Sequence, residues 1–265
     1  MISAPPQIPS YAQGFAPRDG PPANLNLWTG LQGLWVPALG PTGVTLFDQS
    51  PFKRDGTLTN MDPATAWVAT EMAWACELAA AGNQYLSAPV ETTYPFTLVL
   101  SAETSIYPDD RALFGLFDPG VNAWRLFTRG VNSFRLQTWD DGGVANAEFA
   151  CTTVGYVQFA LVGASSTDVR LYINTAEVVS YAPGRTPTVN QLRIGYNIQD
   201  QALECSVLQY ALYNRALSVS EIQELYARPY ALSRLRQRVY PAAGAASGLS
   251  IPIAMHHYMQ MMGAA

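Results

Sequence analysis

Paired carboxylates are the first chemistry to look for in this sequence, because two of them can hydrolyse a glycosidic bond. A retaining hydrolase holds a nucleophile and an acid about 5 Å apart, and alternate positions on one strand supply such a pair because they share a face. The sequence contains no Glu-x-Asp and no Asp-x-Glu. Its adjacent pairs, Asp109-Asp110 and Asp140-Asp141, fall in expected turns. We therefore expect no hydrolase of this kind.

Histidine and cysteine supply the other usual catalytic and metal-binding groups. The only histidines, His256 and His257, lie in the C-terminal tail, away from any folded body that could hold them in a catalytic site. Adjacent histidines also diverge, so a metal site there would need several chains. The cysteines lack CxxC spacing and lie in apolar strand-like segments, which predicts that Cys76, Cys151 and Cys205 are buried free thiols. We expect a non-enzymatic protein without a cofactor.

Exposed aromatic rings could instead bind a sugar by stacking on its apolar face. Trp139 stands directly before Asp140, Asp141 and two glycines, so these three residues are our candidate glycan contacts. A strand tryptophan is more often buried, and that alternative stays open for Trp139. The other aromatic candidates are Trp67, Trp74, Trp124, Tyr107 and Tyr196, and the candidate calcium ligands are Asp48, Asp55, Asp118, Asp140 and Asp141.

The composition limits the class of protein. Of the 265 residues, 13% are charged and 49% are hydrophobic, so much of the surface is either uncharged or covered by a partner. A net charge of -5 argues against a nucleic-acid partner. No apolar run reaches transmembrane length, and the N-terminus has neither the basic nor the apolar region of a secretory signal. We therefore expect no membrane partner and assembly in a cytoplasm.

Strand-like segments follow one another from Leu31 to Asn197, with turn signals about every eight to twelve residues, which is typical of a many-stranded sandwich. The clearest strands are predicted at 31–35, 96–102, 112–117, 123–128, 133–139, 156–162, 169–173, 177–181 and 203–213. Their apolar positions predict a core of Phe114, Leu116, Trp124, Leu126, Phe134, Leu136 and Phe159. A capping box of Ser218 and Glu221 predicts a helix that ends at Pro229.

Three phrases near the end of this region carry a family resemblance: Leu171-Tyr172-Ile173-Asn174, Leu192-Arg193-Ile194-Gly195, and Leu212-Tyr213-Asn214-Arg215-Ala216-Leu217-Ser218. Asp48-Gln49-Ser50 and Gly56-Thr57-Leu58-Thr59-Asn60 match an upstream phrase in part. The chain thus resembles the LamG-like, concanavalin A-like jelly-roll family. The resemblance implies an all-β jelly-roll β-sandwich with one short C-terminal helix.

Two departures from that family concern its binding chemistry. Val207-Leu208-Gln209-Tyr210 stands where the family has IDEV, and Asn83-Gln84-Tyr85-Leu86 stands where it has DDYV. The carboxylates of both phrases are replaced here. The family's metal-assisted sugar binding therefore does not transfer directly to this chain.

Extended arms are predicted on either side of a jelly-roll domain at 31–229. Residues 1–30 form a Pro-rich N-terminal arm in which Tyr11, Phe15 and Trp28 are candidate contacts, either with the sandwich itself or with a neighbouring protein. Residues 230–265 form a basic, then Met-rich docking tail, for which disorder is the alternative. The candidate contacts of the tail are Arg234, Arg236, Arg238, Tyr240, Ile251, Ile253, Met255, His256, His257, Tyr258 and Met259.

The arms, together with the segments 34–43 and 57–65, resemble LamG-domain virion structural proteins of tailed bacteriophages. This resemblance implies a head decoration or minor capsid protein, assembled in the host cytoplasm and located in the virion. Its arms would bind neighbouring virion proteins, either major capsid or tail subunits. The protein itself would form a homo-oligomer, and its jelly roll could bind a host-surface glycan. The alternatives are a carbohydrate-binding, lectin-like module and an adhesin associated with a tail or baseplate.

Overall fold

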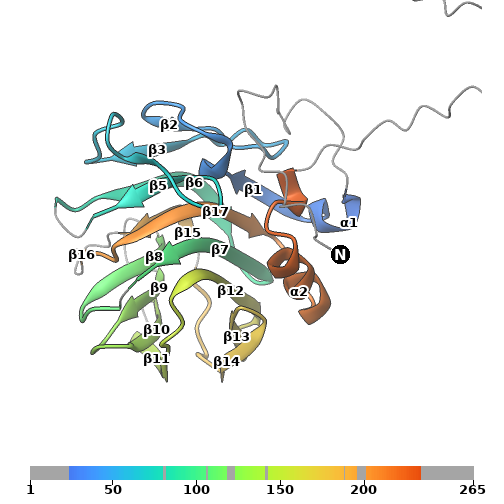
Figure 1. The fold of residues 1–265 in the computed structure, drawn as a ribbon. Helices are drawn as coiled ribbons and strands as arrows, with labels where there is room; N and C mark the ends of the chain where they lie inside the picture. The colour runs from blue at the N-terminus through green and yellow to red at the C-terminus, as the bar shows by residue number, and fades with distance from the viewer. Residues whose placement is uncertain are drawn as a thin grey trace, which may run out of the picture. The chain divides into compact units, whose positions relative to one another are not determined.

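The computed structural model describes residues 24–79, 82–105, 107–117, 123–140, 143–187, 189–195 and 201–233. Strands dominate these residues (Figure 1). In chain order they are β1 (Leu31–Trp35), β2 (Thr45–Leu46), β3 (Gly56–Thr59), β4 (Trp67–Ala69), β5 (Trp74–Leu78), β6 (Tyr85–Thr92), β7 (Phe96–Thr104), β8 (Arg111–Phe117), β9 (Ala123–Thr128), β10 (Ser133–Asp140), β11 (Gly143–Ala150), β12 (Gly155–Ser165), β13 (Asp168–Ile173), β14 (Ala176–Tyr181), β15 (Val189–Gly195), β16 (Gln201–Ala202) and β17 (Cys205–Tyr213). The helical elements are α1 (Leu25–Trp28), α2 (Val219–Ala227) and two 3-10 turns, η3 (Pro37–Leu39) and η4 (Ala231–Ser233).

The first sheet has eight strands, in the order β14-β13-β12-β7-β17-β5-β4, with β1 paired to β17. Its central strands are apolar along most of their length, and all residues of β7 from Phe96 to Ala102 are buried. A strand is apolar along most of its length when both of its faces are covered. Leu98 and Leu100 face the second sheet, and Val99 belongs to a separate cluster on the outward side.

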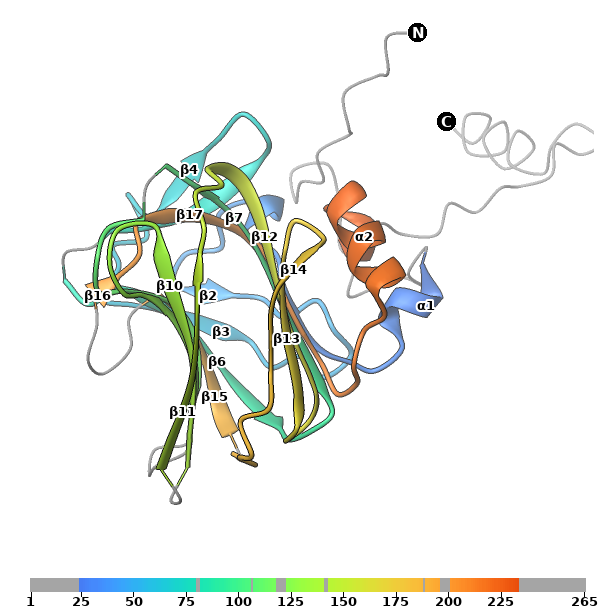
Figure 2. The same ribbon diagram turned by 90° about the horizontal axis from the view of Figure 1, so that it is seen from below.

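The second sheet has nine strands, in the order β11-β10-β9-β8-β15-β6-β3-β2, with the short β16 parallel to β8. Its strands alternate between two kinds of side chain. In β10, Phe134 and Leu136 are buried between the sheets, whereas Arg135 and Gln137 lie on the other side. This alternation leaves a polar face on the second sheet that no helix covers in the part of the chain described (Figure 2).

The core confirms the prediction from the sequence. All seven predicted core side chains are at most 1% exposed and belong to one cluster between the sheets. A second cluster joins the outward face of the first sheet to Leu27 of α1, Ile222 and Leu225 of α2, and Leu232 of η4. Figure 2 shows α1 and α2 on that side of the first sheet. The described helices therefore cover the outward face of the first sheet and not that of the second.

The predicted helix is confirmed, and the predicted strands at 169–173 and 177–181 form a hairpin. Ser218 accepts a hydrogen bond from the backbone N–H of Glu221 at 3.3 Å, and the Glu221 carboxylate accepts one from the Ser218 N–H at 2.8 Å, which completes the capping box. The hairpin joins β13 to β14 through Asn174 and Thr175, both with positive φ, at 51° and 97°. A two-residue hairpin turn requires positive φ, and asparagine tolerates this conformation well.

The structure differs from the predicted division into arms at two places. Residues 24–30 were expected to be extended, but α1 forms there, and Trp28 donates from its indole N–H to the carbonyl of Leu232 at 3.1 Å. The fold was expected to stop at Pro229, but Tyr230, Ala231 and Leu232 are buried against the second cluster. Short apolar segments pack here because α1 and η4 cover each other. The other residues of both arms lie outside the described ranges.

No helix among the described residues is both long enough and apolar enough to cross a membrane.

Candidate functional site

One row of side chains crosses the whole outward face of the second sheet. Directly opposed residues of antiparallel strands point to the same side, so the pairing registers identify the members of the row. From β11 to β2 they are Asn146, Gln137, Arg125, Gly115, Arg193, Ser87, Thr57 and Thr45. None of them is acidic and most can donate hydrogen bonds. The row is therefore a polar track on an otherwise well-packed sheet.

Aromatic rings hold the two arginines of this row. The Arg125 guanidinium lies 4.5 Å from the ring centroid of Phe127 and 5.5 Å from that of Trp139. The Arg193 guanidinium lies 4.9 Å from the centroid of Tyr85 and 5.4 Å from that of Phe117. A guanidinium stacked on rings keeps its plane and its N–H directions fixed. We call the six residues Tyr85, Phe117, Arg125, Phe127, Trp139 and Arg193 the arginine–aromatic face.

The side chains of the arginine–aromatic face differ in exposure: some are buried beneath the surface, and others keep part of their surface open to a ligand. Phe117 and Phe127 are buried, and the Phe117 ring lies so close to Gly115 that a Cβ at that position would be 2.1 Å from the ring. Trp139, Tyr85 and Arg193 are half-buried and keep part of their surface exposed. The buried rings therefore form the floor, while Trp139 and Tyr85 can offer a ring to a ligand.

Polar side chains along the row fix the two guanidinium groups further. Arg125 donates from Nε to the Gln137 Oε1, and Gln137 donates from Nε2 to the Asn146 Oδ1 at 2.8 Å. Arg193 donates from Nε to the Gln191 Oε1 at 2.8 Å. The bond from Arg193 uses its Nε–H and leaves the two NH2 groups at the end of the side chain for other acceptors. The row is thus ordered before any ligand binds.

Two of the three glycan contacts proposed from the sequence, Trp139 and Asp140, lie at one end of this face. Trp139 is half-buried and contacts Arg125. Its ring is therefore neither fully buried nor freely exposed. The carboxylate of Asp140 accepts from Arg185 Nη1 at 3.0 Å. Asp141 lies outside the described residues. Trp139 therefore belongs to a larger aromatic surface, and Asp140 forms an ion pair beside it.

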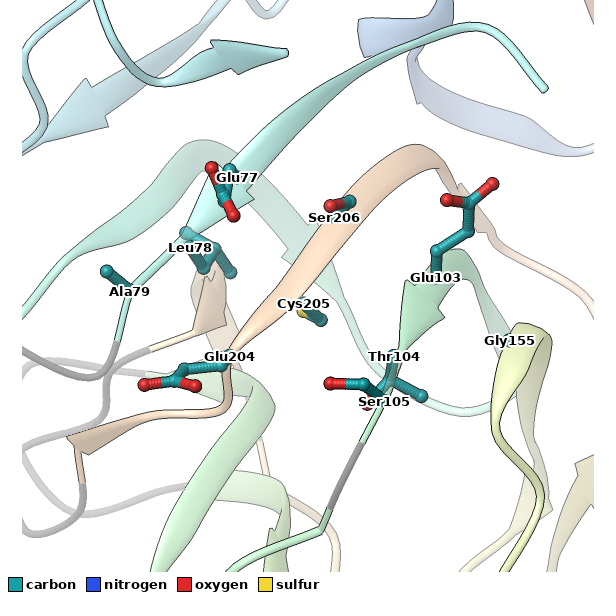
Figure 3. A pocket seen from close by; sticks show the side chains of 10 residues that line it. All are labelled: Glu77, Leu78, Ala79, Glu103, Thr104, Ser105, Gly155, Glu204, Cys205 and Ser206. Atoms are coloured by element: carbon teal, nitrogen blue, oxygen red, sulfur yellow. The ribbon is translucent and has the colours of Figure 1, made fainter. Parts of the chain in front are cut away.

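A second surface is a hollow of about 520 Å³ at the ends of the neighbouring strands β5, β17 and β7 of the first sheet (Figure 3). Its polar lining includes Glu77 of β5, Glu103 of β7, Ser206 of β17 and Glu204, which precedes β17. Ser206 stands opposite Glu77 on one side and Glu103 on the other, so the three side chains share a face. No lining residue is basic. We call this surface the acidic hollow.

Neither the acidic hollow nor the described candidate calcium ligands form a metal site among the described residues. Within the described ranges, no three His, Cys, Asp or Glu side chains are placed to hold a metal ion. The Asp48 carboxylate instead accepts from the backbone N–H groups of Leu34, Ser50 and Arg54 at 2.8 Å each, and from the Ser50 hydroxyl at 2.7 Å. Asp55 accepts from the Asp48 N–H at 2.9 Å. These two aspartates order the loop between β1 and β3, and Asp118 lies outside the described residues.

The cysteines are buried free thiols, as predicted. Burial raises the pKa of the Cys205 thiol to about 12, and burial, with Cys205 nearby, raises that of Cys76 to about 12. A thiolate is the nucleophilic and metal-binding form of cysteine, so both thiols are unreactive in the folded state. They act as small apolar side chains of the core.

The assembly contacts proposed from the sequence are described at one position only. Trp28 packs against its own chain at η4, and whether it also contacts a neighbouring protein stays a prediction. The other members lie outside the described residues, namely Tyr11, Phe15, Arg234, Arg236, Arg238, Tyr240, Ile251, Ile253, Met255, His256, His257, Tyr258 and Met259.

Sequence reasoning did not find Arg125, Arg193 or Tyr85 as site residues. A local signal was present, because Arg125 alternates with the core residues Trp124 and Leu126. A charged residue at that position marks the solvent side of a half-buried strand. What the sequence did not indicate is the pairing of β8 with β15, which places Arg193 opposite Gly115.

Comparisons with known proteins agree with this fold. The family model described as the concanavalin A-like lectin/glucanases superfamily matches residues 80–223. A comparison with curated protein sequences found no match. Residues 80–223 contain every member of the arginine–aromatic face, so the face lies within the matched segment.

Three solved structures illustrate the likeness. Domain 4 of AbnA, a GH43 extracellular arabinanase from Geobacillus stearothermophilus solved in complex with arabinotriose, has a TM-score of 0.60 and 15% identity, covering 74% of this chain and 98% of that one. The binding domain of Paraclostridial Mosquitocidal Protein 1 has a TM-score of 0.59 and 14% identity, covering 77% and 53%. Trypanosoma rangeli sialidase has a TM-score of 0.56 and 16% identity, covering 77% and 33%. This chain thus spans about half of the second protein and a third of the third, and such identities show a shared fold.

Proposed function

Because the chain belongs to the concanavalin A-like lectin/glucanases superfamily, we propose that it is a non-enzymatic carbohydrate-binding protein whose glycan lies on the arginine–aromatic face. The observation that carries this proposal is the ordered polar row between half-buried rings on the outward face of the second sheet. Sugars present hydroxyl groups at their edges and C–H groups on their ring faces. A row of hydrogen-bonding groups beside Trp139 and Tyr85 matches both.

The similarity to domain 4 of the arabinanase, solved with arabinotriose, supports a binding role for the same fold in this chain. The fold alone does not fix a function. The proposal therefore rests on the site, and it excludes turnover. The alternation of carboxylates that retaining hydrolysis needs is missing from every strand of the sequence.

The test is a glycan panel of neutral and acidic oligosaccharides, probed with the full chain and followed by titration of the best binders. We expect binding without release of shorter sugars. Trp139→Ala should weaken binding about 3- to 10-fold, since one aromatic contact contributes about 0.5–1.5 kcal/mol. Trp28→Ala is the matched control, because that indole is also half-buried but lies on the side of the first sheet.

Three results would contradict the proposal. The wild-type chain binding nothing on the panel would remove the binding role. Equal weakening by Trp28→Ala and Trp139→Ala would show that the effect is not local to the face. Release of shorter sugars that is lost in Glu77→Gln or Glu103→Gln would identify an enzyme at the acidic hollow instead.

The virion role stays a prediction from the sequence, because nearly all of the arm and tail residues that suggested it lie outside the described ranges. It is compatible with the proposed binding role, since a virion protein can carry a glycan-binding domain. The same holds for the predicted homo-oligomer and for the predicted capsid or tail partners.

A further inference from the structure

We propose that the glycan bound on the arginine–aromatic face is anionic, with a carboxylate or sulfate group that Arg193 binds. The inference rests on the proposed function and adds the chemical class of the ligand. Its grounds are the state of Arg193, the spacing of the two arginines, and the charge of the acidic hollow.

Arg193 is a half-buried cation that the fold orients for a ligand. It lies between the rings of Tyr85 and Phe117 and donates from Nε to Gln191. No carboxylate pairs with it among the described residues. A guanidinium held by two rings and a hydrogen bond from its Nε presents its terminal N–H groups in a planar fork, which matches two oxygens of a carboxylate or sulfate.

Other arginines of the fold have their charge matched by a carboxylate. The ion pairs are Arg129–Asp110, Arg135–Glu148, Arg170–Asp168, Arg185–Asp140, Arg215–Glu221 and Arg228–Glu224. Arg193 instead lies in a row that contains no acidic residue. In a chain with a net charge of -5, a half-buried cation that lies over two aromatic rings and has no acidic residue in its row favours an anionic ligand.

The spacing of the two arginines indicates the size of the ligand. Arg125 and Arg193 both stand directly opposite Gly115, on β9 and β15 respectively. Neighbouring strands lie about 4.8 Å apart, so the two backbone positions are about 10 Å apart. The Phe117 ring fills the space over Gly115 between them. This separation is wider than one sugar ring, so we infer an oligosaccharide that places its anionic group at Arg193 and an apolar ring face toward Trp139.

The acidic hollow has the opposite charge. Glu77, Glu103 and Glu204 line it without any basic residue, so it repels an anionic glycan. An acidic oligosaccharide therefore distinguishes the two surfaces, whereas a neutral one does not. This difference makes the charge of the ligand a test of its location.

The experiment compares matched pairs of oligosaccharides by calorimetric titration of the full chain. The carboxylated probe is hexagalacturonate, and its neutral counterpart is the carboxyl-reduced hexamer. The sulfated probe is a κ-carrageenan hexasaccharide, and its counterpart is the desulfated form. We expect at least one acidic probe to bind about 10-fold or more tightly than its neutral counterpart, and to weaken as ionic strength rises. The pair that shows the difference identifies the anionic group.

Variants assign the preference to the site. Arg193→Gln should lose most of the difference between the acidic and the neutral probe, and Arg193→Lys should keep part of it because the charge remains without the planar fork. Arg228→Gln removes the same charge from the end of α2, where the side chain is 64% exposed, and should bind like wild type. Thermal melting of each variant checks that the fold is intact.

The outcomes separate the two proposals. Equal binding of acidic and neutral probes, or a preference that survives Arg193→Gln in a folded variant, overturns the anionic ligand. Binding to neutral members of the glycan panel without binding to either acidic probe overturns it too and leaves the proposed function standing. No binding to any probe or panel member overturns both.

Discussion

At the residue scale, a single buried polar side chain can order a whole loop. Asp48 is fully buried and accepts four hydrogen bonds, three of them from backbone N–H groups. Every buried backbone N–H needs an acceptor. Where the chain turns and has no neighbouring strand to bond with, a buried carboxylate of this kind supplies that acceptor. The family phrase that begins at Asp48 is therefore structural in this chain.

Replacing this carboxylate should lower the free energy of unfolding. In Asp48→Asn, an NH2 group would stand where Oδ2 accepts from Ser50 and Arg54, so a donor would meet a donor. We expect a loss of about 2–3 kcal/mol in urea denaturation. Asp62→Asn is the control, because Asp62 is exposed and its Oδ1 acceptor for Ala64 is retained; it should change stability by less than about 0.5 kcal/mol. Equal effects of the two variants would show that the buried network contributes little.

The buried thiols give a second test at this scale. Because the pKa values of Cys76 and Cys205 are raised to about 12, their thiolates are negligible at pH 8 in the folded state. In a Cys151→Ser variant, we expect no reaction with Ellman's reagent until guanidinium unfolds the chain, and then two thiols per chain. A thiol that reacts rapidly in native buffer would contradict their burial.

At the element scale, Arg215 and Glu221 connect α1, β17 and α2. Arg215 donates to the carbonyl of Thr29 at 2.6 Å and to both carboxylate oxygens of Glu221, at 2.9 and 2.7 Å. The hydrogen bond from Arg215, followed by those from Ser218, lowers the pKa of Glu221 from 4.5 to about 2. The helix that covers the first sheet is thus held at its start by a charged residue.

This lowered pKa predicts a defined acid sensitivity. A carboxyl whose pKa is lower in the folded state stabilises the fold above its unfolded pKa, and that contribution is lost as the pH falls from about 4.5 to about 2. Glu221→Gln should therefore cost about 1–2 kcal/mol at pH 7 and much less near pH 2.5, measured by urea denaturation at both values. Glu224→Gln, on the exposed side of the same helix, should differ little from wild type at either pH. A Glu221→Gln difference that does not depend on pH would contradict the assignment.

The C-terminal boundary of the fold is also an element-scale prediction. A chain that stops after Ser233 keeps η4, whereas one that stops after Pro229 loses the buried Tyr230 and Leu232. It also loses the carbonyl groups of Ala231 and Leu232, which accept from the side chains of Asn24 and Trp28.

The two truncations should differ strongly in stability. We expect the chain ending at Ser233 to unfold like the full chain and the chain ending at Pro229 to be less stable by several kcal/mol, measured by urea denaturation. Equal stability would show that η4 contributes nothing. The first truncation is also the right one for testing the tail in virion incorporation, since it removes the predicted docking residues without disturbing the core.

The sequence predicted most of the long elements because their periodicity is strong, but it did not predict the eight-residue strands β6 and β11. The strands with a continuous apolar run, such as β7, β12 and β17, are those covered on both faces, and α2 has a complete capping box. Short strands such as β2, β4 and β16 carry two or three residues, too few to show a period. The arginine–aromatic face was missed for a different reason. It depends on β8 lying between β9 and β15, an order that follows from the packing of the whole sheet and not from local spacing.

At the scale of the whole molecule, the two sheets have different roles. The helices and the second apolar cluster cover the first sheet, so its outward face stabilises the fold. The second sheet has one face in the core and one polar face, which carries the proposed glycan site. The acidic hollow lies at the ends of β5, β17 and β7 of the first sheet and is the competing surface for a ligand. The central claim is therefore a statement about location: a glycan binds on the arginine–aromatic face.

The most direct test is to map the bound glycan by nuclear magnetic resonance, with the full chain titrated by the tightest binder of the panel. The account predicts that perturbed signals gather on β8, β9, β10 and β15 and include the side-chain Nε–H of Arg193 and the indole N–H of Trp139. Perturbations confined to Glu77, Glu103, Glu204 and their neighbours would contradict it, because they would place the glycan at the acidic hollow.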